Sequence, residues 1–321
     1  MAQFRNPSDV YVWPEDADYP YTLWSIGSFL LCIFVAKILS PLYFGQTSEV
    51  YRRLQPTEKC EWDSRCVSSL HAASVSVLSF ISLVVDHDLW INPITTVSRV
   101  GCIALAISIG YMIADIISML AFQSGMELFL FSFHHLLVAI CFCFLLTYRV
   151  GVLFGLMRLT SEISTPFLNQ RWFTKIIGGD GAQYRVATIT LFFSSTFFLG
   201  RYVLAFPYWY VFVSNFNTPP HLQIAHGLPR SVGFFICLPA LLDCLNIVWG
   251  FPVFAITKKA LRTLHFLPAQ TKEKVDDEQR QQQQQQNGTV VDSDSRNETP
   301  CHDHCNGTSN GSVPRAYTSE H

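Results

Sequence analysis

The sequence has few charged residues. Lys, Arg, Asp and Glu together make up 14% of its 321 residues, whereas a soluble domain carries roughly 25%. Hydrophobic residues account for 50%, and 26 residues are Phe. The formal net charge is only -2, so the basic footprint of a nucleic-acid-binding protein is absent and no nucleic-acid partner is expected. This composition predicts a polytopic membrane protein.

The motifs that mark common soluble enzymes are also missing. The chain has no Walker loop, dinucleotide-binding fingerprint, nucleophile elbow or HExxH sequence, which excludes those enzyme classes, and no cofactor is predicted. Ten Cys would suggest disulfides in a short secreted chain. Six of them lie inside apolar runs, where a free Cys behaves as a small hydrophobe: Cys32, Cys102, Cys141, Cys143, Cys237 and Cys244.

Long apolar runs dominate what is present. Twenty helical residues rise about 30 Å, the thickness of the hydrocarbon core of a bilayer. The sequence therefore predicts an all-α, polytopic transmembrane helix bundle of about seven spans. They are residues 22–44, 67–85, 100–122, 128–147, 150–168, 186–213 and 232–257. The second run holds six Ser and His71, and an interfacial helix is its alternative.

The chain outside these runs is polar. Residues 1–21 form a polar N-terminal segment, and residues 268–321 include a glutamine run. Such a tail cannot bury enough apolar surface to fold alone, so we predict that it is disordered.

Basic residues are distributed unevenly between the runs. They concentrate in two charged loops, residues 45–65 and 173–185, and in the stretch that begins at Lys258. Seven spans place these three segments on one side of the membrane. The positive-inside rule then predicts an N-terminus that is lumenal or outside and a cytosolic C-terminus.

Nine polar side chains interrupt the apolar runs. A charge at a helix centre costs roughly 2.5 to 3.5 kcal/mol on insertion scales, so several charges on different helices predict a shared polar interior. The nine are His71, Asp115, His134, His135, Arg158, Glu162, Arg201, Asp243 and Asn246, and Tyr111 lies one helical turn before Asp115.

Each of these groups also has a simpler structural interpretation. Arg158 and Glu162 have the i,i+4 spacing of an intrahelical ion pair. Asp243 and Asn246 would hold helices together by hydrogen bonds. Arg201 would extend its guanidinium towards the membrane interface.

His134 and His135 carry a chemical hypothesis. A neutral imidazole beside a carboxylate such as Asp115 or Glu162 can act as a general base or as a transient acyl carrier. Neighbouring helical residues point about 100° apart, so both rings cannot easily bind one ion, and no metal site is predicted. The Cys and His cluster at residues 301–305 has no second group of Cys or His residues with the spacing of a zinc site.

The order and spacing of these residues resemble a known membrane domain. The matching motifs are Lys59-Cys-Glu-Trp62 with Arg65 and His71, Gly110-Tyr111 with Asp115, His134-His135, Arg158 with Glu162, Ser164-Thr-Pro-Phe167, Asn169-Gln-Arg-Trp-Phe173, and Asp243 with Asn246. Together they resemble the lipid-linked TLC domain over residues 59–264. The resemblance implies membrane lipids as partners and the endoplasmic reticulum membrane as the location; it does not imply an oligomeric state.

This chain departs from the catalytic motif of the family at one place, and that difference bears on whether it is an enzyme. Ceramide synthases, the catalytic branch, follow the His pair with a His-Asp dipeptide and a second Asp three residues later. With Gly151 aligned to the family's glycine, this chain has Arg158-Leu159 and Glu162 there. Only the last carboxylate has a counterpart.

The resemblance therefore favours a protein that acts in membrane lipid homeostasis by binding or regulating lipids in a polar cavity. Its predicted lipid contacts are His71, Tyr111, Arg158, Asp243 and Asn246, together with the His pair and Glu162. The alternative is a lipid acyltransferase with acyl-CoA as co-substrate. Its predicted catalytic residues are His134, His135, Glu162 and Asp115, so whether the protein is an enzyme stays open. A translocation role is a third, weaker possibility.

The predicted orientation can be tested on the tail. Four N-glycosylation sequons, at Asn287, Asn297, Asn306 and Asn310, are usable only if the tail is lumenal. We expect all four to stay unmodified, as measured by gel mobility with and without a glycosidase. A glycosidase-sensitive shift that disappears when these Asn are replaced would overturn the orientation.

Overall fold

The computed structural model describes residues 19–219, 221–222 and 231–266, with the backbone alone at residues 19–20 and 231–235. Most of the predicted N-terminal segment and all of the predicted disordered tail lie outside the described residues. The elements, in order, are α1 (Tyr19–Phe34), the π-helical turn η1 (Val35–Leu39), α2 (Ser40–Thr47), α3 (Glu49–Arg53), α4 (Pro56–Val85), α5 (Asp88–Ile91), α6 (Arg99–Met119), α7 (Gly125–Tyr148), α8 (Val152–Leu159), the 3-10 turn η2 (Thr160–Ser164), α9 (Thr165–Ile177), α10 (Ala182–Phe198), the π-helical turn η3 (Leu199–Val203), α11 (Ala205–Asn215) and α13 (Ser231–Thr263).

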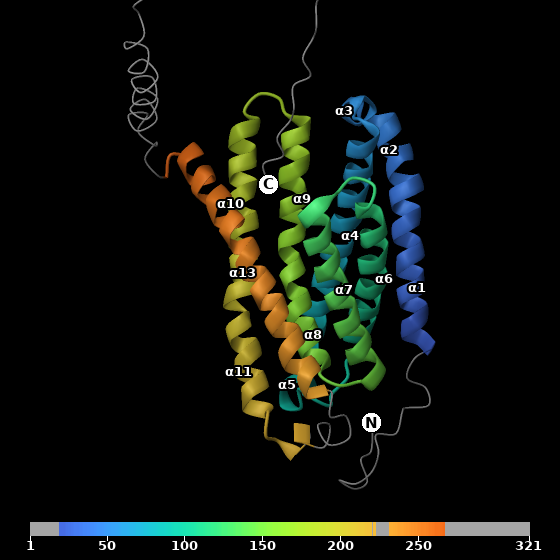
Figure 1. Cartoon of the computed structure of the whole chain (residues 1–321), viewed down its shortest axis with the longest axis vertical. Helices are drawn as coiled ribbons and strands as arrows, with labels where there is room; N and C mark the ends of the chain where they lie inside the picture. Colours follow the sequence, from blue (N-terminus) through green and yellow to red (C-terminus); the bar gives the residue numbers. More distant parts are fainter. Residues whose placement is uncertain (1–18, 220, 223–230, 267–321) are drawn as a thin grey trace, which may run out of the picture. The chain divides into compact units, whose positions relative to one another are not determined.

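Six stretches of continuous helix are long and apolar enough to cross a membrane. They are Tyr21–Thr47, Pro56–Val85, Arg99–Met119, Gly125–Tyr148, Ala182–Asn215 and Ile236–Thr263. Figure 1 shows them as a bundle of roughly parallel rods. The predicted all-α, multi-pass membrane fold is therefore confirmed, and the Ser-rich run after Val67 belongs to a long helix, α4.

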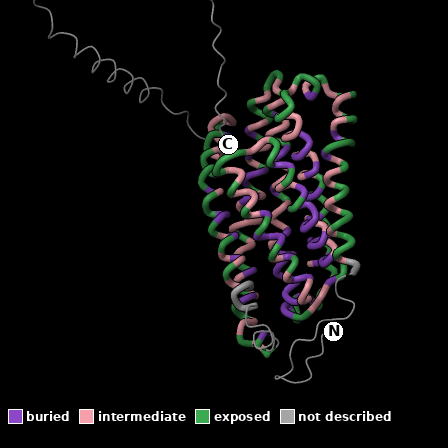
Figure 2. The backbone as a smooth tube through the Cα atoms, turned by 45° about the vertical axis from the view of Figure 1, so that its right-hand side comes forward, coloured by how far each residue is buried: buried purple, intermediate pink, exposed green. Residues whose placement is uncertain are grey.

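The outer surface of the bundle is apolar. Large hydrophobic side chains such as Leu30, Phe80, Phe206 and Phe251 are 58%, 65%, 78% and 73% exposed, and Figure 2 shows exposed residues along the outward faces of the helices. Exposed side chains of this size on every side would be unfavourable in water. They match the surroundings of a protein in lipid.

The predicted fifth span, residues 150–168, is not a single helix. Pro166 has no N–H with which to bond back to the carbonyl of Glu162, and the Thr165 N–H takes that carbonyl in a 3-10 bond instead. The segment consequently divides into α8, η2 and α9.

This divided segment nevertheless extends along the whole of α4. Leu156 of α8 packs at Gly101 beside Ser82, near one end of α4, and Trp172 of α9 contacts Trp62 near the other end. The 20 residues between those α4 positions rise about 30 Å. Within the described residues the chain thus traverses the bundle seven times, six times as a continuous helix and once as the divided segment.

The three basic segments lie at one end of the bundle. Trp62 contacts Phe173, Arg171 donates to Thr190, and Ser194 shares a hydrogen bond with Thr257. The prediction that residues 45–65 form a loop is wrong, because α2, α3 and the first turns of α4 make most of this segment helical.

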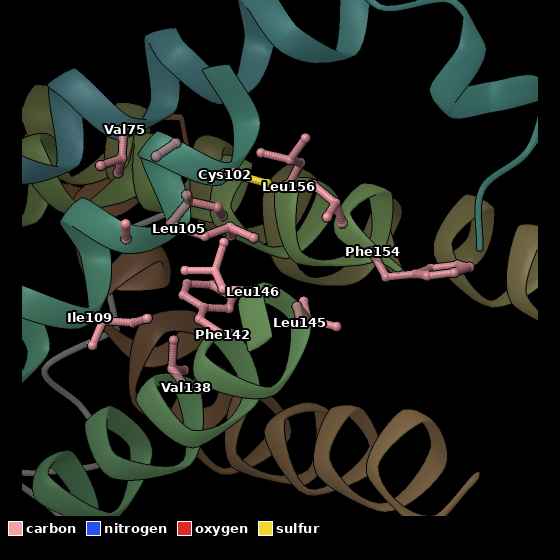
Figure 3. Close-up of a cluster of buried hydrophobic side chains, with 14 of the residues drawn as sticks. Val75, Cys102, Leu105, Ile109, Val138, Phe142, Leu145, Leu146, Phe154 and Leu156 are labelled. Atoms are coloured by element: carbon pink, nitrogen blue, oxygen red, sulfur yellow. The ribbon is translucent and has the colours of Figure 1, made fainter. Parts of the chain in front are cut away.

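The main hydrophobic core joins α4, α6, α7 and α8. Val75, Cys102, Leu105 and Leu156 are fully buried in it, and Figure 3 shows them with Phe142 and neighbouring residues between these helices. α6 lies at the centre and packs against α1, α4 and α7.

Small residues allow α1 to approach α6 closely. A Cβ at Gly110 would lie 2.1 Å from the carbonyl oxygen of Ser25. Ser25 and Ser28 each donate a side-chain hydrogen bond to a backbone carbonyl of α6, at 2.9 and 2.8 Å. This is the packing by which helices associate in lipid, through small side chains and interhelical hydrogen bonds.

Gly110→Ala tests this contact. We expect the free energy of unfolding to fall by about 1–3 kcal/mol, because the new Cβ must displace the α1 backbone. Gly27→Ala is the matched control, since no heavy atom lies within 4 Å of its Cβ position and the helix propensity of Ala is favourable there. Thermal unfolding of the purified protein in detergent measures both; equal midpoints for the two variants would contradict the packing.

Candidate functional site

A cavity of about 60 Å³ lies among α7, α8, η2, η3 and α13. Since one water needs roughly 10–15 Å³ of such volume, it holds roughly four to six groups of that size. Its polar lining residues are His134, Arg158, Ser161, Glu162, Arg201, Tyr208 and Asn246, and its apolar lining includes Met112, Val138, Phe142, Phe144, Leu145, Phe154 and Leu242. The structure thus brings four of the predicted site residues together, namely His134, Arg158, Glu162 and Asn246.

Two irregular turns present charged residues to this cavity. Glu162 lies on the 3-10 turn that Pro166 causes. Arg201 lies on η3, where the Leu204 N–H bonds to the Leu199 carbonyl five residues back, at 3.0 Å. Pro207 follows and lacks an N–H for the carbonyl of residue 203, which explains why the α-helix is interrupted there.

The two turns pack directly against each other. A Cβ at Gly200 would lie 3.1 Å from the Cα of Ser161, so the absence of a side chain at Gly200 lets η3 approach η2 closely. Glu162 and Arg201, which neighbour these two residues, consequently line the same cavity.

Arg158 is paired with Asp243 of α13. Its Nη1 and Nη2 donate to the two carboxylate oxygens at 2.5 and 2.8 Å, and Trp209 donates to the same carboxylate at 2.8 Å. The guanidinium also lies 4.0 Å from the ring centre of Tyr208. A bidentate pair of this kind is the strong form of a charge-assisted hydrogen bond.

The predicted intrahelical pair between Arg158 and Glu162 is wrong. The α-helix ends at Leu159, so the i,i+4 geometry no longer applies to these residues. Glu162 accepts a hydrogen bond from Thr165 at 2.8 Å, and no ion pair joins it to Arg158 anywhere in the described chain.

Arg201 is bound to Asn246 rather than extended to the interface. Its Nη1 donates to the Asn246 side-chain oxygen at 2.9 Å, and Tyr202 donates to the Asn246 backbone carbonyl at 2.9 Å. Asp243 and Asn246 therefore each hold an arginine of another element, and the alternative interpretation of Arg201, an interfacial position, is wrong.

The two adjacent histidines face different surroundings, although their rings lie edge-on with centres 5.6 Å apart. His134 lines the cavity and lies edge-on to Trp249, with ring centres 5.0 Å apart. Its Nδ1 is buried and has no hydrogen-bond partner among the described residues.

His135 instead faces a second polar cluster between α4, α6 and α7. Its Nδ1 lies 2.7 Å from the Phe131 carbonyl oxygen, its Nε2 lies 3.1 Å from Asp115 Oδ2, and Ser64 donates to Asp115 Oδ1 at 2.8 Å. A carbonyl only accepts, so Nδ1 carries a proton, and a second proton must lie between Nε2 and the carboxylate. Neither ring nitrogen of His135 is free for a ligand.

His71 and Tyr111 belong to this second cluster and not to the cavity. Their rings stack with centres 3.8 Å apart, and both residues are buried. Neither ring nitrogen of His71 has a hydrogen-bond partner within the part of the chain that the structure describes. The predicted site is thus divided, with Asp115, His135, His71 and Tyr111 in one cluster and His134, Arg158, Glu162 and Asn246 at the cavity. Asp243 pairs with Arg158 and is not among the described lining residues.

Two further contributors were not among the predicted site residues. Arg201 was noted only as a polar interruption of its run, although Pro207, six residues on, marks a helix irregularity beside a charge. Trp249 lies in an apolar run, and nothing in the sequence distinguishes it from a lipid-facing residue. Among the described residues, no group of three or more His, Cys, Asp or Glu is placed to hold a metal ion; residues 301–305 lie outside them.

A double-mutant cycle tests the separation of the two histidines. We expect Asp115→Ala and His135→Ala to be non-additive in the free energy of unfolding by at least about 0.5 kcal/mol, because the side chains share one contact. Asp115→Ala with His134→Ala is the matched control, and its coupling should be smaller, because His134 reaches Asp115 only through His135. Thermal unfolding in detergent measures the stability of all five variants. Equal coupling energies in the two cycles would show that the histidines do not face different clusters.

Comparison with known proteins finds one family. The model of the TLC domain matches residues 61–255, a range that includes every residue of both clusters. The chain is 32% identical to TLC domain-containing protein 4 of Xenopus tropicalis over 232 residues, which are 71% of this chain and 86% of that protein. It is 29% identical to TLC domain-containing protein 4-B of Danio rerio over 71% of this chain and 85% of that protein. It is 24% identical to TLC domain-containing protein 4 of Homo sapiens over 69% of this chain and 83% of that protein. No solved structure matches it.

Proposed function

Because the chain belongs to the TLC-domain family and is a multi-pass membrane protein, we propose that it acts in membrane lipid homeostasis by binding a lipid at the cavity around His134, Arg158 and Arg201. One observation carries the proposal. Each of these side chains lines the cavity and has a buried nitrogen without a hydrogen-bond partner in the described structure: Nδ1 of His134 and Nε of both arginines. A buried polar group left unpaired costs about 1–3 kcal/mol, and a bound polar group would remove that cost.

The walls of the cavity suit the rest of a lipid. Phe142, Phe144, Leu145 and Met112 line it, so the first carbons that follow the polar group would meet apolar side chains. A few polar groups in an apolar cavity between helices is the usual composition of a small-molecule site. We place the protein in the endoplasmic reticulum membrane on the family resemblance alone, and co-localisation with a marker of that membrane checks it.

A lipid acyltransferase is the second candidate. The supporting observation is that His134 and Glu162 line one cavity. The imidazole can act as a general base, and the carboxylate can assist it. His135 contributes nothing directly, since both of its ring nitrogens face other acceptors. Under this candidate acyl-CoA is the co-substrate and His134 is the base or the transient acyl carrier.

Lipid analysis of cells that lack the protein tests the proposal. Rescue with the wild-type chain should restore the lipid composition, whereas His134→Ala should restore less than about half of the change at equal protein level. The matched control is His87→Ala, an exposed residue between α4 and α5, which should rescue fully.

Full rescue by His134→Ala would place the function away from the cavity. The same membranes assayed for acyl transfer from acyl-CoA separate the two candidates. Transfer that the wild type supports and His134→Ala abolishes identifies an enzyme. Normal rescue without any transfer identifies a lipid-binding protein.

A further inference from the structure

The polar groups that line the cavity are unequal in hydrogen-bond character. The unpartnered Nε atoms of Arg158 and Arg201 can only donate, because a guanidinium has no acceptor. His134 Nδ1 either donates or accepts according to its tautomer. Glu162 carries the only carboxylate among the described lining residues, and one of its oxygens already accepts from Thr165. The unmet hydrogen-bond capacity of the described lining residues is therefore mainly donor capacity.

The charges of the lining residues also favour an anionic ligand. Arg158 is neutralised by the bidentate contact with Asp243. Arg201 makes its side-chain contact with a neutral amide, Asn246, and within the described residues no carboxylate oxygen lies within 4.0 Å of its guanidinium. A guanidinium inside a helix bundle without a carboxylate in contact is costly. An anion would supply the missing contact.

The volume limits the size of the group. About 60 Å³ accommodates roughly four to six water-sized groups, which suffices for a carboxylate with its first carbons or for a phosphate.

We infer that the cavity binds the anionic oxygen group, a carboxylate or a phosphate monoester, at the head of a long-chain lipid, and that Arg201 is its principal contact. This inference rests on the proposed function of the cavity. We expect lipids with an ammonium head to bind less tightly, because an ammonium would leave both Nε donors unpaired and could pair only with Glu162 on the described lining. The planar fork of arginine, rather than its charge alone, makes the contact.

Four probes with the same 18-carbon chain test the inference on the purified full-length protein in detergent. They are oleate, oleyl phosphate, oleylamine and oleyl alcohol. We expect oleate or oleyl phosphate to bind at least about tenfold more tightly than oleylamine and oleyl alcohol. The ranking of the two anions identifies the source of the oxygen group. This comparison uses the wild-type chain, so it stands even where a variant fails to fold.

Variants then locate the contact. Arg201→Gln and Arg201→Lys should each weaken binding of the preferred anion at least about tenfold, because lysine keeps the charge and loses the fork. Arg171→Gln, outside the cavity lining and bound to Thr190, is the matched control and should leave binding unchanged. Bound anion should also protect Cys141, a lining residue, from alkylation as measured by mass spectrometry.

The outcomes separate the inference from the proposed function. Tightest binding of oleylamine or oleyl alcohol, with Cys141 protected, overturns the anion inference and leaves lipid binding at the cavity in place. Anion binding that both Arg201 variants retain, or that leaves Cys141 unprotected, places the contact elsewhere and also overturns the inference. Absence of binding by all four probes overturns the inference and the proposed function together.

Discussion

The ion pair between Arg158 and Asp243 is the contact on which the cavity depends. A lone charge within a membrane-spanning helix is costly, and two opposite charges in bidentate contact offset most of that cost. The pair joins α8 to α13, and Trp209 adds α11 through its own hydrogen bond to the carboxylate. With these three elements fixed, the contact between the Arg158 guanidinium and the Tyr208 ring closes one wall of the cavity. Removing either charge would leave the other buried and unpaired.

Proline supplies the second constraint. Pro166 and Pro207 each remove one backbone donor, and the helices respond with a tighter turn at η2 and a wider turn at η3. Those are the turns that present Glu162 and Arg201 to the cavity, and Gly200 lets them pack closely. Polar side chains and two of the helix irregularities thus coincide at the cavity, in keeping with irregular turns at functional sites, whereas the π-helical turn η1 lies outside the described lining.

The sequence predicted the bundle well and the site in part. Apolar length is a local property, so six of the seven predicted runs appear within long helices. The run 150–168 was misjudged because its apolar length outweighed Pro166. The divergence of His134 and His135 followed from the 100° step of a helix. The partners of Arg158 and Arg201 did not follow from spacing, since Asp243 and Asn246 are 85 and 45 residues away. The i,i+4 rule suggested Glu162 for Arg158 only because it assumes an unbroken helix. His71 and Tyr111 were assigned to one site with Arg158 because polar residues on several helices predict a shared polar interior without showing which neighbour each side chain meets.

The most direct test of a lipid held at this cavity is photo-crosslinking in membranes. A lipid with a photoreactive group next to its polar head is activated in cells that express the full-length protein, and the modified peptides are identified by mass spectrometry. The structure predicts labels on the part of α7 that contains His134 and Cys141 and on α8 near Arg158. Labels confined to outward-facing residues such as Phe206 and Phe251 would contradict it, because they would show that lipids contact only the outside of the bundle.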